Sequence, residues 1–406
     1  MKLPRTEWSE RPEMRRLLGV LGARDGETRF VGGCVRDTLL KLPVSDVDLA
    51  TRIAPQEVLD RLKGAAIKAV PTGIAHGTVT AVIEGRPVEV TTLRRDVATD
   101  GRRATIAYTD DWREDAARRD FTINALTSDP ASRRVYDYFD GLSDLERRRV
   151  RFIGDPYVRI AEDHLRILRF FRFHARFAEG EPDEAALDAC TARANDLMAL
   201  SRERIADELL KLLALPDPAP TVALMLQRGI LRPVLPEISD ARPLQRLVEA
   251  ELDAGIEPHP LRRLASLLPR GADADAAAAA GSRLRLSKKA VKRLSIAAGT
   301  ETGDPKRLAY RLGTEAAVDR LLLAGETGHD LRALERWQPP RLTITGGELI
   351  AMGLPAGPDV ARTLQAIERE WEAADFPAAK ETVRAIADAK VAEALGQSPP
   401  GGLAKR

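Results

Sequence analysis

The sequence predicts an α+β fold, in which a head that contains the strands precedes a long all-α region. Two observations support this prediction. Four short segments rich in β-branched residues lie between residues 28 and 140, bounded by Gly, Pro or polar residues. From about Asp144 to residue 395, apolar residues instead recur at the helical period. The change of period separates a head of mixed structure from a helical remainder.

The strands of the head are expected at TRFVGG, SDVDLAT, GTVTAVI and RPVEVTTL. Two helical patterns, CVRDTLLKL and APQEVLDRLKG, separate the first three of these segments. Residues 94–118 are polar and charged without clear periodicity, so we expect a long flexible loop there.

Two amphipathic helices dominate the start of the all-α region. They are expected at IAEDHLRILRFFRFHARF (160–177) and RERIADELLKLLAL (202–215), and LPDPAP ends the second. The low-complexity residues 271–282 fit a loop or a frayed helix. Further helices extend to about residue 395, and QSPPGGLAKR is expected to be a disordered tail.

Length and composition exclude several classes of protein. The 406 residues, 44% of them hydrophobic, suffice for two to four globular domains. No run of 18 apolar residues occurs, so we expect no membrane-spanning helix. The N-terminal residues contain no apolar signal core, which favours the cytoplasm. Cys34 and Cys190 are too few for a disulfide framework or a cysteine-rich zinc site.

Charge is nearly balanced overall, at a formal net +2, but it is unevenly distributed. Residues 146–176 contain nine Arg against four Asp and Glu. Such a basic segment suits a phosphate-rich ligand. The chain is rich in Arg throughout, however, and this composition explains the segment equally well.

Two aspartates form the densest chemical signal. Asp46 and Asp48 are separated by one residue inside a predicted strand, so both point to the same face. Adjacent carboxylates repel each other, and a divalent cation such as Mg²⁺ relieves that repulsion. Glu89, between Val88 and Val90, is the candidate third carboxylate from a neighbouring strand. Taken alone, an Asp-x-Asp pair is more often a turn or a solvated strand end.

Gly32 and Gly33 follow the first predicted strand and precede a helix. Glycines at this place allow backbone N–H groups to approach a phosphate beside a helix N-terminus. Arg36, one helical turn further on, could reach the same phosphate. The alternative interpretation is a simple turn, with Arg36 on the surface paired with Asp37.

These residues belong to a set of motifs that resembles a known family. GGCVRDTLL followed by DVDL resembles the first motif of class II tRNA nucleotidyltransferases and bacterial poly(A) polymerases, which belong to the DNA polymerase β-like nucleotidyltransferase superfamily. The later motifs follow in the family's order and cover residues up to about 215. They are RRDFTINAL (118–126), YDYFDGLSDL (136–145), EDHLRILRFFRF (162–173) and RERIADELLKLL (202–213), with a weaker likeness in TGGELIAMGLPAGPDV (345–360).

The resemblance implies a polymerase β-like head with a small mixed sheet, followed by a helical neck, body and tail. It also implies ATP, CTP and tRNA as substrates and Mg²⁺ as the metal, with Arg119 and Asp120 near the nucleotide's ribose and phosphates. We expect an N-terminal segment at 1–27, a catalytic head at 28–145 and a base-selecting neck at 146–215. A tRNA-binding body and tail are expected at 216–395, and a disordered C-terminus at 396–406.

The segment that resembles the base-selecting helix has its own physical interpretation. Asp163 and Arg166 are neighbours at i, i+3 on the predicted helix. A carboxylate that accepts and a guanidinium that donates can together match the edge of cytosine or adenine and reject guanine and uracil. Arg169 and Arg172 extend the same stripe toward the triphosphate. The alternative is an ordinary salt bridge on a solvated helix.

The resemblance implies template-independent addition of CCA to the 3′ end of tRNA, and four alternatives to this activity stay open. The resemblance implies that poly(A) polymerases carry a basic Arg-Arg-Phe-Arg-like segment after the aspartate pair, and residues 54–73 lack it. CC-adding relatives tend to lack the long loop at 94–118, which this chain has; an A-adding specialist is a related possibility. A catalytically inactive RNA-binding paralogue would not need Asp46, Asp48 and Glu89. We also hypothesise that the loop acts as a lever that repositions the base-selecting helix for ATP.

Overall fold

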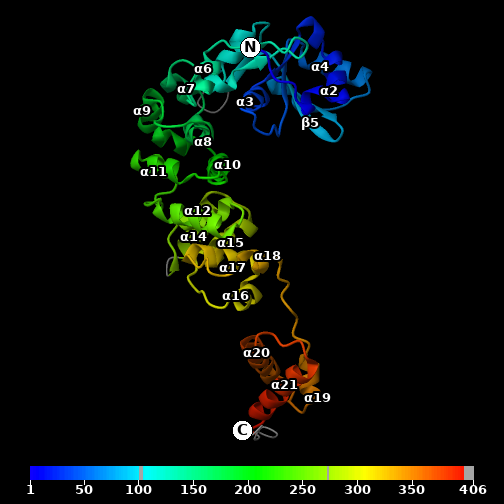
Figure 1. The fold of residues 1–406 in the computed structure, drawn as a ribbon, viewed down its shortest axis with the longest axis vertical. Coiled ribbons are helices and arrows are strands. Elements are labelled where there is room, and N and C mark those ends of the chain that lie inside the picture. The colour runs from blue at the N-terminus through cyan, green and yellow to red at the C-terminus, as the bar shows by residue number, and fades with distance from the viewer. Residues whose placement is uncertain (100–103, 272–273, 397–406) are drawn as a thin grey trace.

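The computed structural model describes residues 1–99, 104–271 and 274–396 and shows an elongated molecule (Figure 1). The head lies at one end, coloured blue to cyan. Green and yellow helices follow in succession, and the orange and red helices form the other end. The predicted α+β fold is therefore confirmed, with the strands gathered in the head.

The main sheet of the head is mixed. Its strands are β1 (Thr28–Val31), β2 (Asp48–Thr51), β3 (Lys68–Gly73), β4 (Thr78–Ile83), β5 (Arg86–Thr92), β8 (Thr127–Ser128) and β9 (Val135–Tyr136). Within the described residues these seven strands are ordered β3-β4-β5-β2-β1-β8-β9. β2 runs parallel to β5, whereas the other neighbouring pairs are antiparallel. The sequence pattern does not predict β3, β8 or β9, because β3 contains Pro and Gly and the other two are only two residues long.

Helices cover one face of this sheet and include the N-terminal segment. They are α1 (Glu7–Glu10), α2 (Pro12–Val20), η1 (Ala23–Asp25), α3 (Gly33–Leu39) and α4 (Pro55–Gly64), with short turns at η2 (Ile74–His76) and η3 (Thr122–Asn124). Leu17 and Leu21 are fully buried, and the Trp8 ring packs edge-on against Phe30 at 4.9 Å. Residues 1–27 are therefore built into the core of the head.

The prediction of a long loop at residues 94–118 is wrong for the part of this range that the structure describes. β6 (Arg94–Thr99) and β7 (Ala104–Tyr108) form an antiparallel hairpin separate from the main sheet, and α5 (Trp112–Ala117) follows. Charged residues in β6 hide the alternation that would identify a strand. The sequence does contain an indication of the start of α5, because Asp is a favoured N-cap residue. The side chain of Asp111 accepts a hydrogen bond from the backbone N–H of Arg113. Residues 100–103 lie outside the described part.

The rest of the chain is helical. Its elements are α6 (Gly141–Glu146), α7 (Pro156–Glu162), α8 (Arg166–Phe177), α9 (Glu184–Ala192), η4 (Ala194–Ala199), α10 (Arg202–Leu213), α11 (Ala219–Gln227), α12 (Arg242–Ala254), α13 (Pro260–Leu267), α14 (Ala274–Arg283), α15 (Lys288–Ala298), α16 (Pro305–Leu312), α17 (Thr314–Ala324), α18 (Leu331–Arg336), α19 (Gly346–Ala351), α20 (Pro358–Ala373) and α21 (Lys380–Ala394). The low-complexity residues thus contribute α14. The predicted disordered tail at 397–406 lies outside the described residues.

The single helix predicted over residues 160–177 is also wrong, because the chain is extended at Asp163. This residue has φ −150° and ψ 106°, which ends α7. Its side chain accepts a hydrogen bond from the backbone N–H of Leu165 at 3.1 Å, and its carbonyl accepts one from Arg166. A short polar side chain that bonds to nearby backbone competes with the helix, so α8 begins anew at Arg166.

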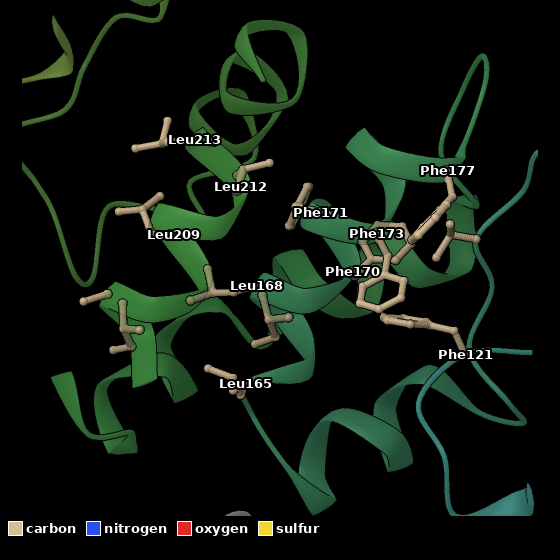
Figure 2. Close-up of a cluster of buried hydrophobic side chains, with 14 of the residues drawn as sticks. Phe121, Leu165, Leu168, Phe170, Phe171, Phe173, Phe177, Leu209, Leu212 and Leu213 are labelled. Carbon is tan, nitrogen blue, oxygen red and sulfur yellow. The ribbon is translucent and has the colours of Figure 1, made fainter. Parts of the chain in front are cut away.

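The helix α8 joins the head to α10 through apolar packing on two sides (Figure 2). Phe173 packs against Phe121 of the head, with ring centroids 5.0 Å apart. On the other side, Leu168 faces the leucines of α10, among them Leu209. Such close-packed contacts fix the distance of α8 from both neighbours.

The first helices of the body continue the core of the head and neck, whereas residues between Leu247 and Leu334 form a second apolar cluster and the tail forms a third. Buried ion pairs join α13, α15 and α17, since Asp319 of α17 accepts hydrogen bonds from Arg262 at 2.8 Å and Arg293 at 2.7 Å. The tail packs against α16, where Tyr310 lies edge-on to Trp371 at 5.7 Å. No helix in the described part of the chain is both long and apolar enough to cross a membrane.

Candidate active site between the head and α8

A cavity of about 550 Å³ lies where the head meets α7 and α8. It is lined by Gly32, Gly33, Arg36, Asp37, Ser45, Asp46, Asp48, Arg118, Arg119, Asp120, Asn124, Asp163, Arg166, Arg169, Arg172, Phe173 and Arg176. Every candidate site residue that the sequence indicates is in this set except Glu89. Seven arginines against five aspartates give the lining a positive excess, which suits a polyphosphate anion.

The carboxylates of the cavity meet at one end of the parallel pair β2 and β5. Asp48 is the first residue of β2, and its register partner on β5 is Glu89. Val88 and Val90 are buried while Glu89 is exposed, so Glu89 points to the face opposite the two valines. Two strands that are far apart in sequence thus bring two acidic side chains together.

Asp46 differs from its expected place, because it precedes β2 and is not part of the strand. It lies in the irregular segment between α3 and β2, where its carboxylate accepts a hydrogen bond from Ser45 Oγ at 2.8 Å. It still lines the cavity beside Asp48. The pair therefore shares the cavity through the loop geometry and not through strand alternation.

The crowding of negative charge affects Asp48 directly. Burial, together with the negative charges of Glu89 and Asp46, raises the pKa of Asp48 to about 6, and the positive charge of Arg119 opposes this shift. Carboxylates that disfavour each other's ionised forms in this way gain from a bound cation. The donor set at the edge of β2 therefore fits a hard divalent metal.

Gly32 adopts a backbone conformation that requires glycine, with φ 66° and ψ −123°. A Cβ atom at this position would lie 3.1 Å from Nη1 of Arg119. The turn thus allows Arg119 to approach the backbone just before α3. This arrangement places the start of α3 and a guanidinium at the same end of the cavity.

Arg36 forms the salt bridge to Asp37 that the alternative interpretation considers, with Nε to Oδ1 at 2.7 Å. It is not a surface residue, however, since both side chains are buried and line the cavity. Its Nη1 also donates to Oδ1 of Asn124 at 2.5 Å. Asn124 in turn donates to Asp120 at 2.9 Å, which links α3 to the segment containing Asp120.

Asp120 is the junction between the head and α8. Its carboxylate accepts hydrogen bonds from Arg169 Nε at 2.7 Å and from the backbone N–H of Phe121 at 2.8 Å. Burial by itself raises the pKa of Asp120, but the charge of Arg169 and hydrogen bonds from Asn124, Arg169 and Phe121 outweigh it and lower the pKa to about 2. Asp120 therefore stays ionised and holds Arg169 at the cavity wall.

Asp163 and Arg166 do not form the predicted i, i+3 pair with each other. The carboxylate of Asp163 accepts two hydrogen bonds from Nη2 of Arg204, at 3.0 and 2.8 Å. The guanidinium of Arg166 donates to Glu162 at 2.5 Å and to the carbonyls of Arg159 and Arg118 at 2.8 and 2.9 Å. Both side chains are held in place separately.

The helix α10 supplies two residues that hold the cavity lining without being part of it. Arg204 binds Asp163, and Glu208 accepts a hydrogen bond from Arg172 Nε at 2.6 Å while lying 3.7 Å from Arg169 Nη1. This helix coincides with the motif RERIADELLKLL (202–213), which by itself does not identify either residue as part of the site. Their signal is a charged pair at i, i+4 within an amphipathic pattern. Arg118 and Asn124 were also missed, although both lie in RRDFTINAL.

Comparison with known proteins gives consistent similarities. Residues 28–151 match the poly A polymerase head domain, and residues 181–242 match the probable RNA and SrmB-binding site of polymerase A. The chain is 31% identical to the mitochondrial CCA tRNA nucleotidyltransferase 1 of Mus musculus, over 89% of this chain and 87% of that protein. It is 32% identical to the CCA-adding enzyme of Levilactobacillus brevis, over 89% of this chain and 94% of that protein. The crystal structure of the Bacillus stearothermophilus CCA-adding enzyme in complex with CTP superposes with a TM-score of 0.74 at 28% identity, over 93% of this chain and 97% of that chain.

Proposed function

Because this chain belongs to the family of CCA-adding tRNA nucleotidyltransferases, we propose that it adds C, C and A in turn to the 3′ end of tRNA. It uses CTP and ATP, releases pyrophosphate and needs no nucleic-acid template. The observation that carries this proposal is a cavity in which two aspartates of the head meet the basic residues of α8. The similarity to CCA-adding relatives over most of both chains supports it.

We assign Mg²⁺ to Asp46 and Asp48, with Glu89 as a third carboxylate beside them. In the described residues, no three His, Cys, Asp or Glu side chains form a ready-made metal cage. Mg²⁺ usually takes one or two carboxylates and completes its shell with water and substrate phosphates. When bound, the metal supplies activation of the 3′-hydroxyl and stabilisation of the leaving pyrophosphate.

The triphosphate is assigned to the end of the cavity near α3. The backbone N–H groups after Gly32 and the guanidinium of Arg119 lie together there, and Arg36 lines the same end. Charge-assisted hydrogen bonds of this kind are the strong ones for phosphate. The carboxylate of Asp120 already accepts hydrogen bonds from Arg169, Asn124 and the backbone N–H of Phe121. We therefore assign to Asp120 the role of holding Arg169 in place.

The base is assigned to Asp163 and Arg166. A carboxylate offers about four lone-pair sites, and the backbone N–H of Leu165 and Nη2 of Arg204 do not use all of them. Arg166 has donors beyond the three hydrogen bonds described above. The remaining acceptor of Asp163 pairs with the exocyclic amine of cytosine or adenine, and a remaining donor of Arg166 pairs with a ring nitrogen or carbonyl. Arg169 and Arg172 extend this wall toward the phosphates.

We divide the chain into a head at residues 28–145, a neck at 146–215, and a body and tail that together cover 216–395. The body and tail are assigned to tRNA binding. Lys288, Lys289 and Lys292 are exposed on α15 and offer positive charge to a phosphate backbone. We also propose a cytoplasmic location, for which fractionation of cells expressing the tagged protein is the test.

The test of this function is an incorporation assay with tRNAs that end before, within and after CCA, each with labelled CTP and ATP. We expect two C residues followed by one A, and no addition to tRNA that already ends in CCA. A long tract of A made from ATP alone would identify a poly(A) polymerase, which the match of the head domain also allows. Addition of only C or only A would identify a partial enzyme, and no incorporation would identify an inactive RNA-binding protein.

A further inference from the structure

A buried carboxylate on α5 lies behind the cavity and contacts two of its arginines. Asp115 is only 4% exposed. Its carboxylate accepts hydrogen bonds from Arg118 Nε at 3.0 Å, Arg119 Nη2 at 3.3 Å and the backbone N–H of Arg94 at 3.3 Å. Asp115 does not itself line the cavity. One side chain thus connects the first residue of β6 to two arginines of the cavity wall.

The two arginines that Asp115 holds have separate roles in the cavity. Arg119 lies against the turn at Gly32, and its charge acts on Asp48. The carbonyl of Arg118 accepts a hydrogen bond from Arg166 Nη2 at 2.9 Å. Asp115 therefore contacts Arg119, which lies at the phosphate end of the cavity. It reaches the base end indirectly, because it contacts Arg118 and Arg118 in turn contacts Arg166.

The orientation of Arg119 depends strongly on this contact. Its Nε is buried and has no hydrogen-bond partner in the described part of the chain. The bond from Nη2 to Asp115 is thus what restricts rotation of the guanidinium. Burial by itself raises the pKa of Asp115, but the charges of Arg119 and Arg118, with hydrogen bonds from Arg118 and the Arg94 N–H, lower it below its usual range. Asp115 accordingly remains charged and able to hold both arginines.

We propose that Asp115 is a positioning residue for the incoming nucleotide, which fixes Arg119 against the phosphate-binding turn and Arg118 beneath Arg166. The proposal rests on the proposed function, because it assigns the nucleotide to this cavity. A guanidinium held in its binding geometry before the ligand arrives loses less conformational entropy on binding. Without Asp115, the two arginines would lose conformational entropy when the nucleotide binds, and the affinity for the nucleotide would be lower.

A matched control is available in the body of the same protein. Asp319 is fully buried and, like Asp115, accepts hydrogen bonds from two arginines, Arg262 and Arg293. It belongs to α17, away from the cavity. Asp319→Asn therefore removes the same charge from the same kind of buried arginine pair without touching the nucleotide site.

The experiment measures KM and kcat for CTP and ATP on tRNA ends, together with the melting temperature, for the full-length wild type, Asp115→Asn and Asp319→Asn. We expect both variants to melt at lower temperature. Only Asp115→Asn should raise the nucleotide KM, by roughly ten- to a hundred-fold, the loss typical of a misplaced binding group, with little change in kcat. An unchanged KM in Asp115→Asn, or an equal rise in Asp319→Asn, would overturn the proposal.

A double-mutant cycle tests whether Asp115 acts through Arg119. If it does, Asp115→Asn adds little to the KM increase already caused by Arg119→Ala, because the group that Asp115 positions is gone. Fully additive effects would contradict this route. The same measurements separate a failure of the proposed function from a failure of the role of Asp115. A wild-type protein that transfers no nucleotide contradicts the proposed function, whereas an active wild type with a normal KM in Asp115→Asn contradicts only the role of Asp115.

Discussion

Asp48 and Glu89 lie directly opposite each other on the parallel strands β2 and β5. The two residues are far apart in sequence, and Asp46 adds a third carboxylate from the loop before β2. Burial first, and then the negative charges of Glu89 and Asp46, raise the pKa of Asp48 to about 6, so a bound cation would favour its ionised form.

The first prediction concerns these carboxylates. Asp46→Asn or Asp48→Asn should lower nucleotide addition by at least about a hundred-fold, because the loss of a metal ligand removes several kcal/mol of transition-state stabilisation. Binding of tRNA, measured by filter retention, should persist. Asp60→Asn on the exposed face of α4 is the control and should remain active. Retention of more than about a tenth of wild-type turnover in either variant would exclude the two-metal assignment.

The second prediction concerns base choice. Asp163→Ala should reduce the preference for CTP over UTP by about ten-fold or more, because a site built to accept a hydrogen bond from the exocyclic amine then lacks its acceptor. Misincorporation of UTP and GTP is measured alongside CTP and ATP. Asp207→Ala is the control, since this residue pairs with Lys211 on the exposed side of α10. Equal losses for all four nucleotides in Asp163→Ala would show that this residue does not select the base.

The third prediction concerns acid stability. The pKa of Asp120 is lowered from 3.8 to about 2 in the folded protein, so Asp120 contributes about 2 kcal/mol of stability above pH 4 that is lost as the pH falls toward 2. The sign follows because the unfolded chain binds the proton first as the pH decreases. Urea unfolding between pH 5 and 2.5 should therefore show a smaller pH dependence in Asp120→Asn than in the wild type. Parallel curves for the two proteins would contradict this assignment.

The fourth prediction concerns the turn before α3. Gly32→Ala should destabilise the head by about 1–3 kcal/mol, the usual cost of a side chain in a strained backbone conformation, and should push Arg119 away. The nucleotide KM should rise as a result. Gly19→Ala is the control, because it lies within α2 with open space around it and should be neutral or slightly stabilising. A Gly32→Ala protein with normal stability and KM would show that the turn is not constrained.

The fifth prediction concerns the hairpin of β6 and β7 as a lever. Replacing residues 98–106 with a short Gly-Ser linker keeps Arg94 and α5, whose contacts support the cavity. Addition of C should be retained and addition of A should fall by about ten-fold or more, since the pocket must change shape for a purine. Incorporation is compared on tRNA ending before CCA and on tRNA ending in CC. Equal losses at all three positions would refute the lever and leave the hairpin a role in folding or tRNA binding.

The sequence contains enough information to identify most of the cavity lining. Gly32, Arg36, Asp46 and Asp48 lie within one short stretch. Each signal is ambiguous by itself, and the resemblance of the whole stretch to a family motif is what predicts a phosphate and metal site. Asp120 and the residues from Asp163 to Arg172 are identified by motif order. These positions are read from local spacing or from resemblance, and neither requires knowledge of long-range contacts.

Other features could not be read from local patterns. The apolar period predicts one helix over 160–177, but the side chain of Asp163 bonds to the backbone and divides it. The polarity of residues 94–99 suggests a loop, although strand pairing depends on a partner further along the chain. Backbone hydrogen bonds to a distant strand are invisible to a pattern that records only which side chains are apolar.

The sequence by itself determined the fold class, the family and the residue types of the site, because periodicity and motif spacing are properties of neighbouring residues. Only the tertiary structure decided which charges hold each other. Asp163 is paired with Arg204 rather than with Arg166, and Arg118 and Arg119 are held by Asp115. The physical reason is that an ion pair forms where packed helices and strands bring side chains within about 4 Å, and that distance is set by the apolar cores around α5, α8 and α10.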